Sequence, residues 1–460
     1  MSGVRDIART AAYTAGLKEA LTGRHDARFV WLCNFEAEAA WARGRTGLPL
    51  PRASAAGALA HRMEQLGALL AEPGDVLLLG EDLDPDFRRY AERAGLGLPD
   101  VLVADGGYQG TPEAVLASPR LLGELRQLAG QGAYLMPMGN SAVEQRIAEV
   151  TGLRLAVAGA DVCERVNSKI YSRRICAALG LRTVPGHICG SVAELREAVG
   201  RYDPGARPLI VKDAYGVSGK GLLVLDSAAR ADRLLRMVDS RARRTGSDAL
   251  ELVVEHLLPK SADLAYQFVV DRAGRVHLDF VKEALISGGV PNGNLTPAAL
   301  TDDQHEELVA AAHLLGGRLH EDGFFGVVGV DALLGADGSL YPVLEINARL
   351  SMGSYQGRVI ERFLPPGGVA LAKHYPLTLT RRVPFAGVEA ALAAAGGAPG
   401  PGGGAVITCF GTLGAGARAA APSRGRLYTL LFAADRASLT ALDGRIAREL
   451  GRVPGIEETA

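Results

Sequence analysis

The sequence predicts an α/β domain, then a larger α+β domain, and last a small C-terminal α/β domain. Between Arg28 and about Val157, short apolar runs such as "RFVWLC" and "DVLLLG" alternate with helix-like stretches, which is typical of βαβ units with a parallel sheet. Beyond residue 161, hairpins are expected between helices. The stretch "GGAPGPGGGA" is rich in glycine, as flexible linkers are. We therefore expect domains at 1–160, 161–385 and 406–460, with a Gly/Ala/Pro-rich linker at 386–405.

Composition and charge exclude several classes of function. Of the 460 residues, 48% are hydrophobic and 22% are charged, and the formal net charge is -1. Basic residues form no block that would bind a polyanion, so we expect no nucleic-acid partner. The apolar runs are too short to span a bilayer, and the sequence does not open like a signal peptide, so we expect a cytoplasmic protein with no membrane partner. We also expect a homodimer.

A helix is predicted at the start of the second domain, in "NSKIYSRRICAALGLRTVPG". Asn167 and Ser168 are cap-type residues, apolar residues then recur on one helical face, and Gly180 ends the helix. Lys169 lies in the first turn and Arg173 one turn later on the same polar side. A lysine at a helix start suits a bound anion, although a solvated helix face explains both side chains equally well.

The segment "KDAYGVSGKGLLVL" is a candidate phosphate cradle, because Lys212 ends a predicted strand and three glycines occupy the turn that leads into the next one. Glycines let backbone N–H groups approach phosphate oxygens closely, and Lys212 can add a charge. The segment is not a P-loop, since GxxxxGK[ST] is absent, and no helix follows as in a dinucleotide fingerprint. A plain Gly-rich hairpin turn remains the alternative. Lys220 would either reach a phosphate or point to solvent.

Two antiparallel hairpins are predicted further on. The first, "DLAYQFVVDRAGRVHLDFVKEA", turns at "DRAG", and a helix from Asp302 to about His320 precedes the second. The second hairpin turns around position 338, and Asp331 and Glu345 are symmetric about that position. A turn with an odd number of loop residues would place the two carboxylates directly opposite each other on one face, whereas an even number would break the pairing.

The strand "YPVLEINARL" places Glu345, Asn347 and Arg349 at every second position, so the three side chains share one face. Two carboxylates that face each other across a ladder repel unless a cation lies between them. With the amide oxygen of Asn347, Asp331 and Glu345 would offer three hard oxygen donors, which suit Mg²⁺ together with substrate phosphates. The alternative is a pair of solvated carboxylates near a hairpin.

The order of these pieces resembles the ATP-grasp superfamily. The resemblance covers about Cys163 to Gly357, and its most specific element is "EINAR". It implies a pre-ATP-grasp α/β domain, an ATP-grasp fold of two α+β lobes that clamp ATP, and ATP and Mg²⁺ as cofactors. In the N-terminal and C-terminal parts, the chain resembles the pheganomycin-type peptide ligases.

The resemblance also implies roles for individual residues. Lys169 and Lys212 would contact the nucleotide phosphates, and Asp263 resembles the ribose-binding acid. Arg349 matches the arginine near the transferred phosphoryl group. The loop over the phosphates would include Gly216, Ser218, Gly219, Lys220 and Gly221, the segment that lines the adenine would be Glu255, His256, Leu257 and Leu258, and the magnesium ligands would be Asp331, Glu345 and Asn347.

Two further elements near these residues are candidates for substrate contacts. Lys282, after the strand "RVHLDFV", would contact a phosphate or a carboxylate, with a solvated lysine as the alternative. Backbone amides in "RLSMGSY" could bind the carboxylate of a substrate.

The resemblance implies an ATP-dependent peptide ligase that works through an acyl phosphate, and the residues described above suit that chemistry. The resemblance implies that the carboxylate of an amino acid, often one with an amidino group, is joined to the amine of a peptide or amino acid. Arg349 would hold the oxyanion that forms at the carbonyl. A dipeptide or γ-glutamyl ligase is the nearest alternative. A non-catalytic ATP-binding protein is the other, although such a chain is expected to lack a metal ligand or Arg349.

Overall fold

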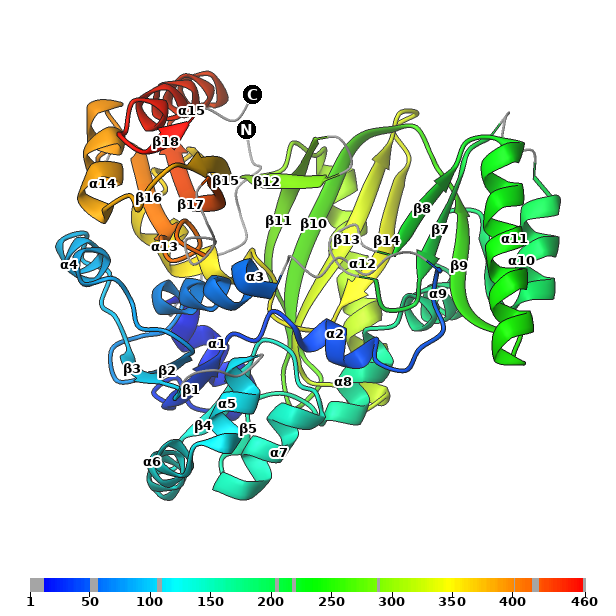
Figure 1. Cartoon of the computed structure of the whole chain (residues 1–460), viewed down its shortest axis with the longest axis horizontal. Helices are drawn as coiled ribbons and strands as arrows, with labels where there is room; N and C mark the ends of the chain where they lie inside the picture. The colour runs from blue at the N-terminus through cyan, green and yellow to red at the C-terminus, as the bar shows by residue number, and fades with distance from the viewer. Residues whose placement is uncertain are drawn as a thin grey trace.

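The computed structural model describes residues 12–49, 57–105, 110–202, 207–216, 221–287, 290–400, 402–415 and 422–457. In this part of the chain the strands form a parallel sheet near the N-terminus, a small antiparallel sheet and a long central sheet. Figure 1 shows the parallel sheet at the lower left, the central sheet in the middle and the small sheet at the right. The C-terminal elements lie above the N-terminal ones.

The N-terminal sheet confirms the predicted βαβ pattern. Its order is β3-β2-β1-β4-β5, and all of its strand pairs are parallel. The strands β1, β2 and β4 are buried throughout, as expected of parallel strands that are covered on both faces. The strands are β1 (Phe29–Leu32), β2 (Val76–Leu79), β3 (Asp100–Val103), β4 (Tyr134–Pro137) and β5 (Arg154–Leu155). The helices are α1 (Tyr13–Thr22), α2 (Ala37–Trp41), α3 (Gly57–Met63), η2 (Glu64–Leu69), α4 (Pro85–Arg93), α5 (Thr111–Ala117), α6 (Pro119–Gly130) and α7 (Ala142–Thr151).

The small antiparallel sheet forms a separate lobe, which we call the nucleotide lobe because it carries Lys212 and the Gly-rich segment. Its strand order is β6-β9-β7-β8, and two helices cover one face. Two more helices lead into it, and the second confirms the predicted helix at Lys169. The strands are β6 (Gly186–Ser191), β7 (Leu209–Asp213), β8 (Leu222–Leu225) and β9 (Ala249–His256), and the helices are α8 (Ala160–Val166), α9 (Lys169–Ala178), α10 (Val192–Gly200) and α11 (Ala228–Thr245).

The central sheet has the order β14-β13-β10-β11-β12-β15-β17-β16, with β18 paired to β15. Both predicted hairpins are present and antiparallel. The strands are β10 (Lys260–Val270), β11 (Val276–Ser287), β12 (Val290–Thr296), β13 (Gly326–Gly335), β14 (Leu340–Asn347), β15 (Val369–Leu379), β16 (Gly404–Cys409), β17 (Ser423–Ala433) and β18 (Ile456–Glu457). The helices are α12 (Asp302–Glu321), η3 (Ser354–Gln356), α13 (Gly357–Phe363), α14 (Phe385–Ala394) and α15 (Arg436–Gly451).

The segment predicted as a linker is largely helical. Helix α14 occupies residues 385–394, and its residues Phe385, Val388 and Leu392 are buried. Since these side chains pack into a core, the prediction of a linker over the whole of 386–405 was wrong. Only the glycine-rich turn before β16 remains outside regular structure in the described part of this stretch.

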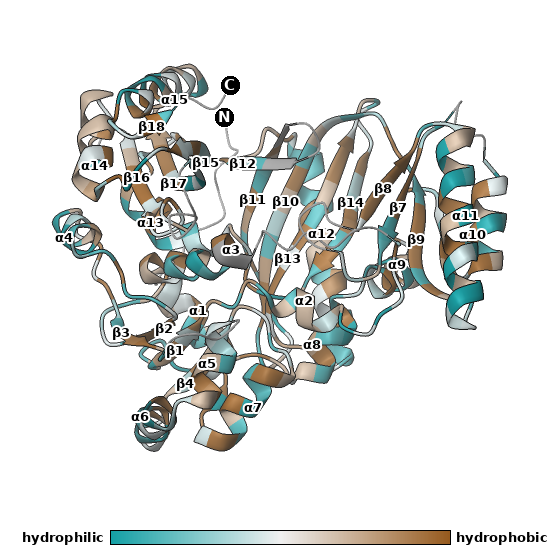
Figure 2. Cartoon of the chain, in the orientation of Figure 1, coloured by the Kyte–Doolittle hydropathy of each residue, from teal (hydrophilic) through white to brown (hydrophobic). Residues whose placement is uncertain are grey.

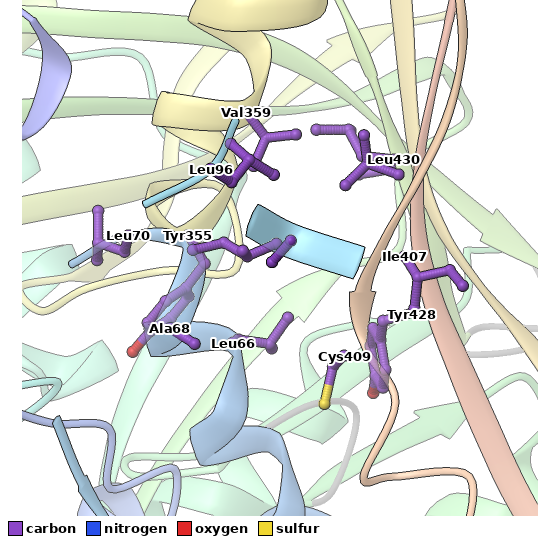
Figure 3. Packing of buried hydrophobic residues seen from close by; sticks show 14 of the residues in the cluster. Leu66, Ala68, Leu70, Leu96, Tyr355, Val359, Ile407, Cys409, Tyr428 and Leu430 are labelled. Atoms are coloured by element: carbon purple, nitrogen blue, oxygen red, sulfur yellow. The ribbon is translucent and has the colours of Figure 1, made fainter. Parts of the chain in front are cut away.

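The C-terminal strands do not form a separate sheet. Strand β17 pairs with β15 from Val369↔Ala433 to Leu379↔Ser423, so β16 and β17 extend the central sheet. Figure 3 shows side chains of η2, η3 and α13 packed with Ile407, Cys409 and Leu430 from these strands. The N-terminal and C-terminal parts therefore share one core, and the division into domains at 160, 385 and 405 stays a prediction.

Hydropathy follows the layers of the fold. In Figure 2 brown residues run through the strands of the sheets, with teal residues between them in the central sheet, and the helices alternate between brown and teal. Among the described residues, no helix is both long and apolar enough to cross a membrane. The cytoplasmic location stays a prediction.

Candidate functional site

A row of site residues crosses four strands of the central sheet. Ala265 of β10 pairs with Lys282 of β11 on one side and with Asp331 of β13 on the other, and Asp331 in turn pairs with Glu345 of β14. Residues in register across a sheet point to the same face, so Lys282, Asp331 and Glu345 share one face. The predicted pairing of Asp331 with Glu345 is present in the structure.

The turn of the second hairpin and a register shift together give this pairing, since the register next to the turn alone would place Asp331 opposite Val343. Leu334 pairs with Leu340, which leaves a loop of residues 335–339, and Gly335 N donates to Ser339 O at 2.8 Å. Gly338 adopts a left-handed φ of 80°, which favours glycine. An odd-numbered loop together with a register shift between Asp331 and Leu333 brings the two carboxylates face to face.

Asp331, Glu345 and Asn347 form an oxygen-rich corner. Asn347 Nδ2 donates to Asp331 Oδ2 at 3.3 Å, and Asn347 lies opposite Gly329 in the same hairpin. Desolvation, followed by repulsion from Glu345, raises the pKa of Asp331 to about 6. Among the described residues, no group of three His, Cys, Asp or Glu side chains is placed to hold a metal. A metal site here would therefore consist of two carboxylates and one amide oxygen, a set of hard donors that suits Mg²⁺ with additional phosphate oxygens.

Lys169 joins three parts of the candidate site. Its backbone N–H donates to Ala214 O at 2.9 Å, and its Nζ donates to Gly216 O at 2.7 Å. The same Nζ forms an ion pair of 2.5 Å with Glu345 Oε1. The side chain is only 5% exposed, so the alternative of a solvated lysine is wrong. Helix α9, the Gly-rich segment and the acidic corner thus meet at one ammonium group.

Lys212 and Arg173 both neutralise Glu255. Lys212 Nζ lies 2.5 Å from Glu255 Oε2, and Arg173 Nη1 lies 2.7 Å from Glu255 Oε1. Arg173 also donates to the carbonyls of Val184 and Gly186, at 3.0 and 2.7 Å. Arg173 is therefore a structural partner of the acid and not part of a solvated helix face. Sequence reasoning left the role of Arg173 open, because its acidic partner Glu255 lies 82 residues further along the chain.

The Gly-rich segment is described at its two ends. Gly216 accepts the bond from Lys169, and Gly221 has a φ of +75°. A Cβ at Gly221 would approach Asp213 Oδ2 to 2.5 Å, so both its conformation and its surroundings require glycine. The predicted phosphate-loop residues Ser218, Gly219 and Lys220 lie outside the described residues.

The segment predicted to line the adenine closes the end of β9. His256 N donates to Pro185 O at 3.0 Å, and the His256 ring packs edge-on against Tyr202 at 4.4 Å between centroids. Leu257 is 43% exposed, which is unusual for a large apolar side chain in this structure, and Leu258 is partly exposed. Asp263 of β10 forms an ion pair of 2.5 Å with Lys260. Nucleotide contacts by these residues stay predictions.

Arg349 is held by a residue from the N-terminal part. Its Nε donates to Glu38 Oε1 at 2.7 Å, and its Nη2 donates to the same oxygen. Nη2 also donates to Asn347 Oδ1 at 3.2 Å. Nη1 donates to Leu350 O at 3.0 Å. Both side chains are largely buried, with 14% and 13% of their areas exposed. Sequence reasoning missed Glu38, which lies on α2 and is separated from Arg349 by most of the chain.

Lys282 is a buried amine without a carboxylate partner in the described part of the chain. It is 1% exposed, and its Nζ donates to Gln356 Oε1 at 2.6 Å and to Gly353 O at 3.4 Å. The Phe280 ring lies 4.0 Å from the same nitrogen. Burial lowers the pKa of Lys282 to about 7. The alternative of a solvated lysine is wrong, and Gln356 is a partner that sequence reasoning missed.

The loop after β14 is tied to the sheet by a buried glutamine. Gln267 Oε1 accepts from Ser351 Oγ at 3.0 Å and from Ser354 Oγ at 2.5 Å. The amides of Ser351 and Gly353 donate to serine hydroxyls of the same loop, at 2.9 and 3.1 Å, and Ser354 N donates to Ser351 O at 3.0 Å. These three amides are therefore bonded within the loop, and the prediction that they bind a substrate carboxylate does not fit this structure.

Comparisons with known proteins agree with this geometry. The family model of the pre ATP-grasp domain matches residues 63–153, and that of the ATP-binding domain of the carbamoyl-phosphate synthase L chain matches residues 168–356. The butirosin acyl-carrier protein–L-glutamate ligase of Niallia circulans is 32% identical over 200 residues, which is 42% of this chain and 45% of that protein. Pyruvate carboxylase 1 of Caenorhabditis elegans is 26% identical over 194 residues, 42% of this chain and 16% of that protein. The chain thus spans less than half the length of these two curated relatives.

Solved structures resemble the chain over almost its whole length. Biotin carboxylase from Campylobacter jejuni superposes with a TM-score of 0.56 at 13% identity, covering 94% of this chain and 93% of that one. An N5-carboxyaminoimidazole ribonucleotide synthetase in its ADP complex gives a TM-score of 0.54 at 14% identity, covering 85% of this chain and 95% of that one. The fold is the ATP-grasp fold with a pre-ATP-grasp domain before it, as predicted.

The two family models and the solved structures make residues 63–153 and 168–356 of this chain similar to ATP-grasp enzymes.

Proposed function

We propose that the chain is an ATP-dependent carboxylate–amine ligase that forms an amide bond through an acyl phosphate. The carboxylate of an amino acid would be joined to the amine of a peptide or amino acid, with release of ADP and phosphate. N-amidino amino acids are among the expected carboxylate donors. The oligomer is proposed to be a homodimer.

One observation supports this proposal above the others. The acidic corner lies on one face of the central sheet, Lys169 of α9 pairs with it, and Arg349, two residues after β14, donates to Asn347. A phosphoryl group transferred at the acidic corner would leave its acyl product next to a permanent positive charge.

The residues present can be assigned to the two chemical steps. Asp331, Glu345 and Asn347 would hold Mg²⁺, which would offset the charge of the phosphates. Lys169 and Lys212 would contact phosphate oxygens, and the carboxylate of the donor would attack the terminal phosphorus. The amine then attacks the acyl carbon, where Arg349 would stabilise the oxyanion by roughly 3–4 kcal/mol. The phosphate leaves with its bonding electrons, and the amine loses one proton to solvent or to a base.

The relatives favour an amino acid as the donor. The protein from Niallia circulans is named as a ligase of L-glutamate to an acyl-carrier protein, and it is 32% identical to this chain over the matched part. This name supports an amino-acid carboxylate for this chain and makes a carrier-bound acceptor the second candidate. A dipeptide or γ-glutamyl ligase has the same chemistry and differs only in the acceptor.

A trapping experiment tests the proposal. The protein is incubated with ATP, Mg²⁺, pooled amino acids and hydroxylamine, and the products are analysed by mass spectrometry. The expected result is an acyl hydroxamate together with ADP. Formation of AMP and pyrophosphate would contradict the acyl-phosphate route. Hydroxylamine is then replaced by pooled amino acids, peptides and a carrier protein with its amine-bearing arm. The mass of the product identifies the acceptor.

A further inference from the structure

The arginine that follows β14 is held from the N-terminal part of the chain at two points. Glu38 Oε1 accepts from Arg349 Nε at 2.7 Å and also from its Nη2. The next residue, Leu350, donates its backbone N–H to Met138 O at 3.0 Å. Glu38 lies on α2, which follows β1, and Met138 follows β4, the parallel neighbour of β1. Both contacts therefore come from the carboxyl edge of the N-terminal sheet, the edge at which open α/β sheets bind their ligands.

Helix α2 is packed firmly enough to hold a side chain in one place. Ala37 and Trp41 are 4% and 3% exposed, and both belong to the core cluster that contains the buried side chains of β13 and β14. Trp41 Nε1 donates to Asn140 O at 3.2 Å. A Cβ at Gly139 would lie 2.9 Å from the Cβ of Ala37, so the turn after β4 needs a glycine for α2 to lie this close. The backbone that carries Glu38 is thus fixed by residues on both sides of it.

The ion pair fixes the direction of the guanidinium. Each of the three nitrogens of Arg349 donates a hydrogen bond, and the acceptors from side chains are Glu38 and Asn347. Asp331 and Glu345 attract Arg349 as well. Without Glu38, a guanidinium on a flexible side chain would turn toward these two carboxylates, which are the proposed metal ligands.

We propose that Glu38 is a positioning residue for the acyl-transfer step, in which it directs Arg349 toward the carbonyl oxygen of the acyl phosphate and away from the metal ligands. This inference rests on the proposed function, which assigns the oxyanion to Arg349. Glu38 acts through the guanidinium. The N-terminal part thereby contributes to the second chemical step, whereas the residues assigned to the phosphates lie in α9, the nucleotide lobe and the central sheet.

The position and the charge of Glu38 can be separated, because one oxygen accepts both bonds from Arg349. Among the described residues, no donor is bonded to Glu38 Oε2. A glutamine could therefore place its amide oxygen where Oε1 lies and its NH₂ group where Oε2 lies. The negative charge itself does not help the reaction, since it opposes the oxyanion that Arg349 attracts. The role assigned to Glu38 thus depends on where its oxygen lies.

The test compares two conservative variants. Glu38→Gln keeps the position of the oxygen and removes the charge, whereas Glu38→Asp keeps the charge and withdraws the oxygen by one methylene group. Each protein is mixed with ATP, Mg²⁺ and pooled amino acids and peptides, and ADP and amide are followed by rapid quench. The rate of amide formation should stay close to native in Glu38→Gln. It should fall roughly 10²-fold in Glu38→Asp, since a misplacement of about 1 Å in an active site costs a factor on that order.

A second readout separates positioning from a merely structural role. In Glu38→Asp the first turnover of ADP and the affinity for ADP·Mg should stay native, so that acyl phosphate accumulates. Hydroxylamine in the quench converts this acyl phosphate into a hydroxamate, which is measured by mass spectrometry. Glu72→Ala is the control, because it removes an acid that pairs with Lys18 at 2.8 Å and belongs to no proposed site. It should lower Tm without accumulation of acyl phosphate.

A double variant covers the case in which Glu38→Asp does not fold. Arg349→Ala and Glu38→Ala/Arg349→Ala should form amide equally slowly, because Glu38 has nothing to position once Arg349 is absent. The double variant also leaves neither charge buried alone. A slower Glu38→Gln than Glu38→Asp, no accumulation of acyl phosphate in Glu38→Asp, or a further loss in the double variant would overturn the inference. A native protein that forms no hydroxamate from ATP and amino acids would instead overturn the proposed function, so the two failures are distinguishable.

Discussion

Replacement of Lys282 by methionine should make the protein more stable and less active. Lys282 is fully buried, and its contacts are the amide oxygen of Gln356, the carbonyl of Gly353 and the Phe280 ring. None of these carries a negative charge that would offset an ammonium group. Methionine has a similar length and fills irregular apolar space well.

The size of the effect follows from the pKa of Lys282, which burial lowers from 10.5 to about 7. At 1.36 kcal/mol per pKa unit, the protonated lysine costs the folded state roughly 5 kcal/mol. Loss of the bond to Gln356 leaves its oxygen unpaired, at a cost of roughly 1–3 kcal/mol. The net gain of Lys282→Met at pH 7 is therefore roughly 2–4 kcal/mol. In a domain of 150–250 residues, each kcal/mol changes Tm by roughly 2–4 °C.

The gain should depend on pH with a definite sign. Because the pKa of Lys282 is lower in the folded state, the unfolded chain binds more protons between about pH 7 and 10.5. The native protein therefore gains stability relative to the variant as the pH rises through this window. The advantage of Lys282→Met is largest at pH 7 and below, and it disappears above about pH 10.5.

The assay is thermal unfolding of both proteins at a series of pH values, with the hydroxamate assay for activity. Activity should fall roughly 10²-fold or more if Lys282 contacts the reacting groups. Lys18 is the matched control, since it is 4% exposed but pairs with Glu72 at 2.8 Å and with Asp75 at 2.9 Å. Lys18→Met should lower stability by roughly 3–5 kcal/mol, because a buried carboxylate loses its partner. A lower Tm of Lys282→Met at pH 7, or a difference that does not change with pH, would refute the reasoning.

Three further predictions concern charge pairing and the C-terminal strands. Glu345→Gln should abolish turnover and also lower Tm, because Lys169 loses its ion pair of 2.5 Å. The double variant Glu345→Gln/Lys169→Met should recover part of the lost Tm. A native Tm in Glu345→Gln would contradict the pairing. Asp331→Asn should abolish Mg²⁺-dependent nucleotide binding in calorimetry. Without metal its Tm should stay the same or rise, because the repulsion from Glu345 is relieved. A clear drop in the metal-free Tm would argue against the repulsion. Deletion of residues 406–460 should leave little soluble protein after expression, because β17 pairs with the full length of β15. A soluble, cooperatively melting truncated protein would contradict the core that the N-terminal and C-terminal parts share.

Glu345 is expected to have a second role besides metal binding, which the strand pattern alone did not indicate. The structure shows that the same carboxylate also pairs with Lys169, a lysine that is 5% exposed. The residue is therefore expected to serve both stability and function.

Local patterns were sufficient for much of the fold. The alternation of apolar runs and helices predicted the parallel sheet, and the spacing around position 338 predicted that Asp331 and Glu345 lie opposite each other. Both inferences depend on neighbours in the sequence, because turn and strand periodicity set the face of each side chain. The exact pairing of Asp331 with Glu345 also needed the register shift between Asp331 and Leu333, which the spacing did not reveal. The prediction of the linker failed because glycine and alanine composition does not reveal whether a helix such as α14 finds a core to pack against.

The sequence by itself determined which chemical groups meet on one hairpin: Asp331, Glu345 and Asn347, with Arg349 two residues after its second strand. Only the tertiary structure decided what surrounds them. Glu38 reaches Arg349 from α2, and Leu48 enters the core of the nucleotide lobe, across separations along the chain of 311 and more than 100 residues. Pairing within a hairpin is set by local geometry, whereas contacts at such separations exist only once the sheets and lobes have packed, since the burial that stabilises them belongs to the whole fold.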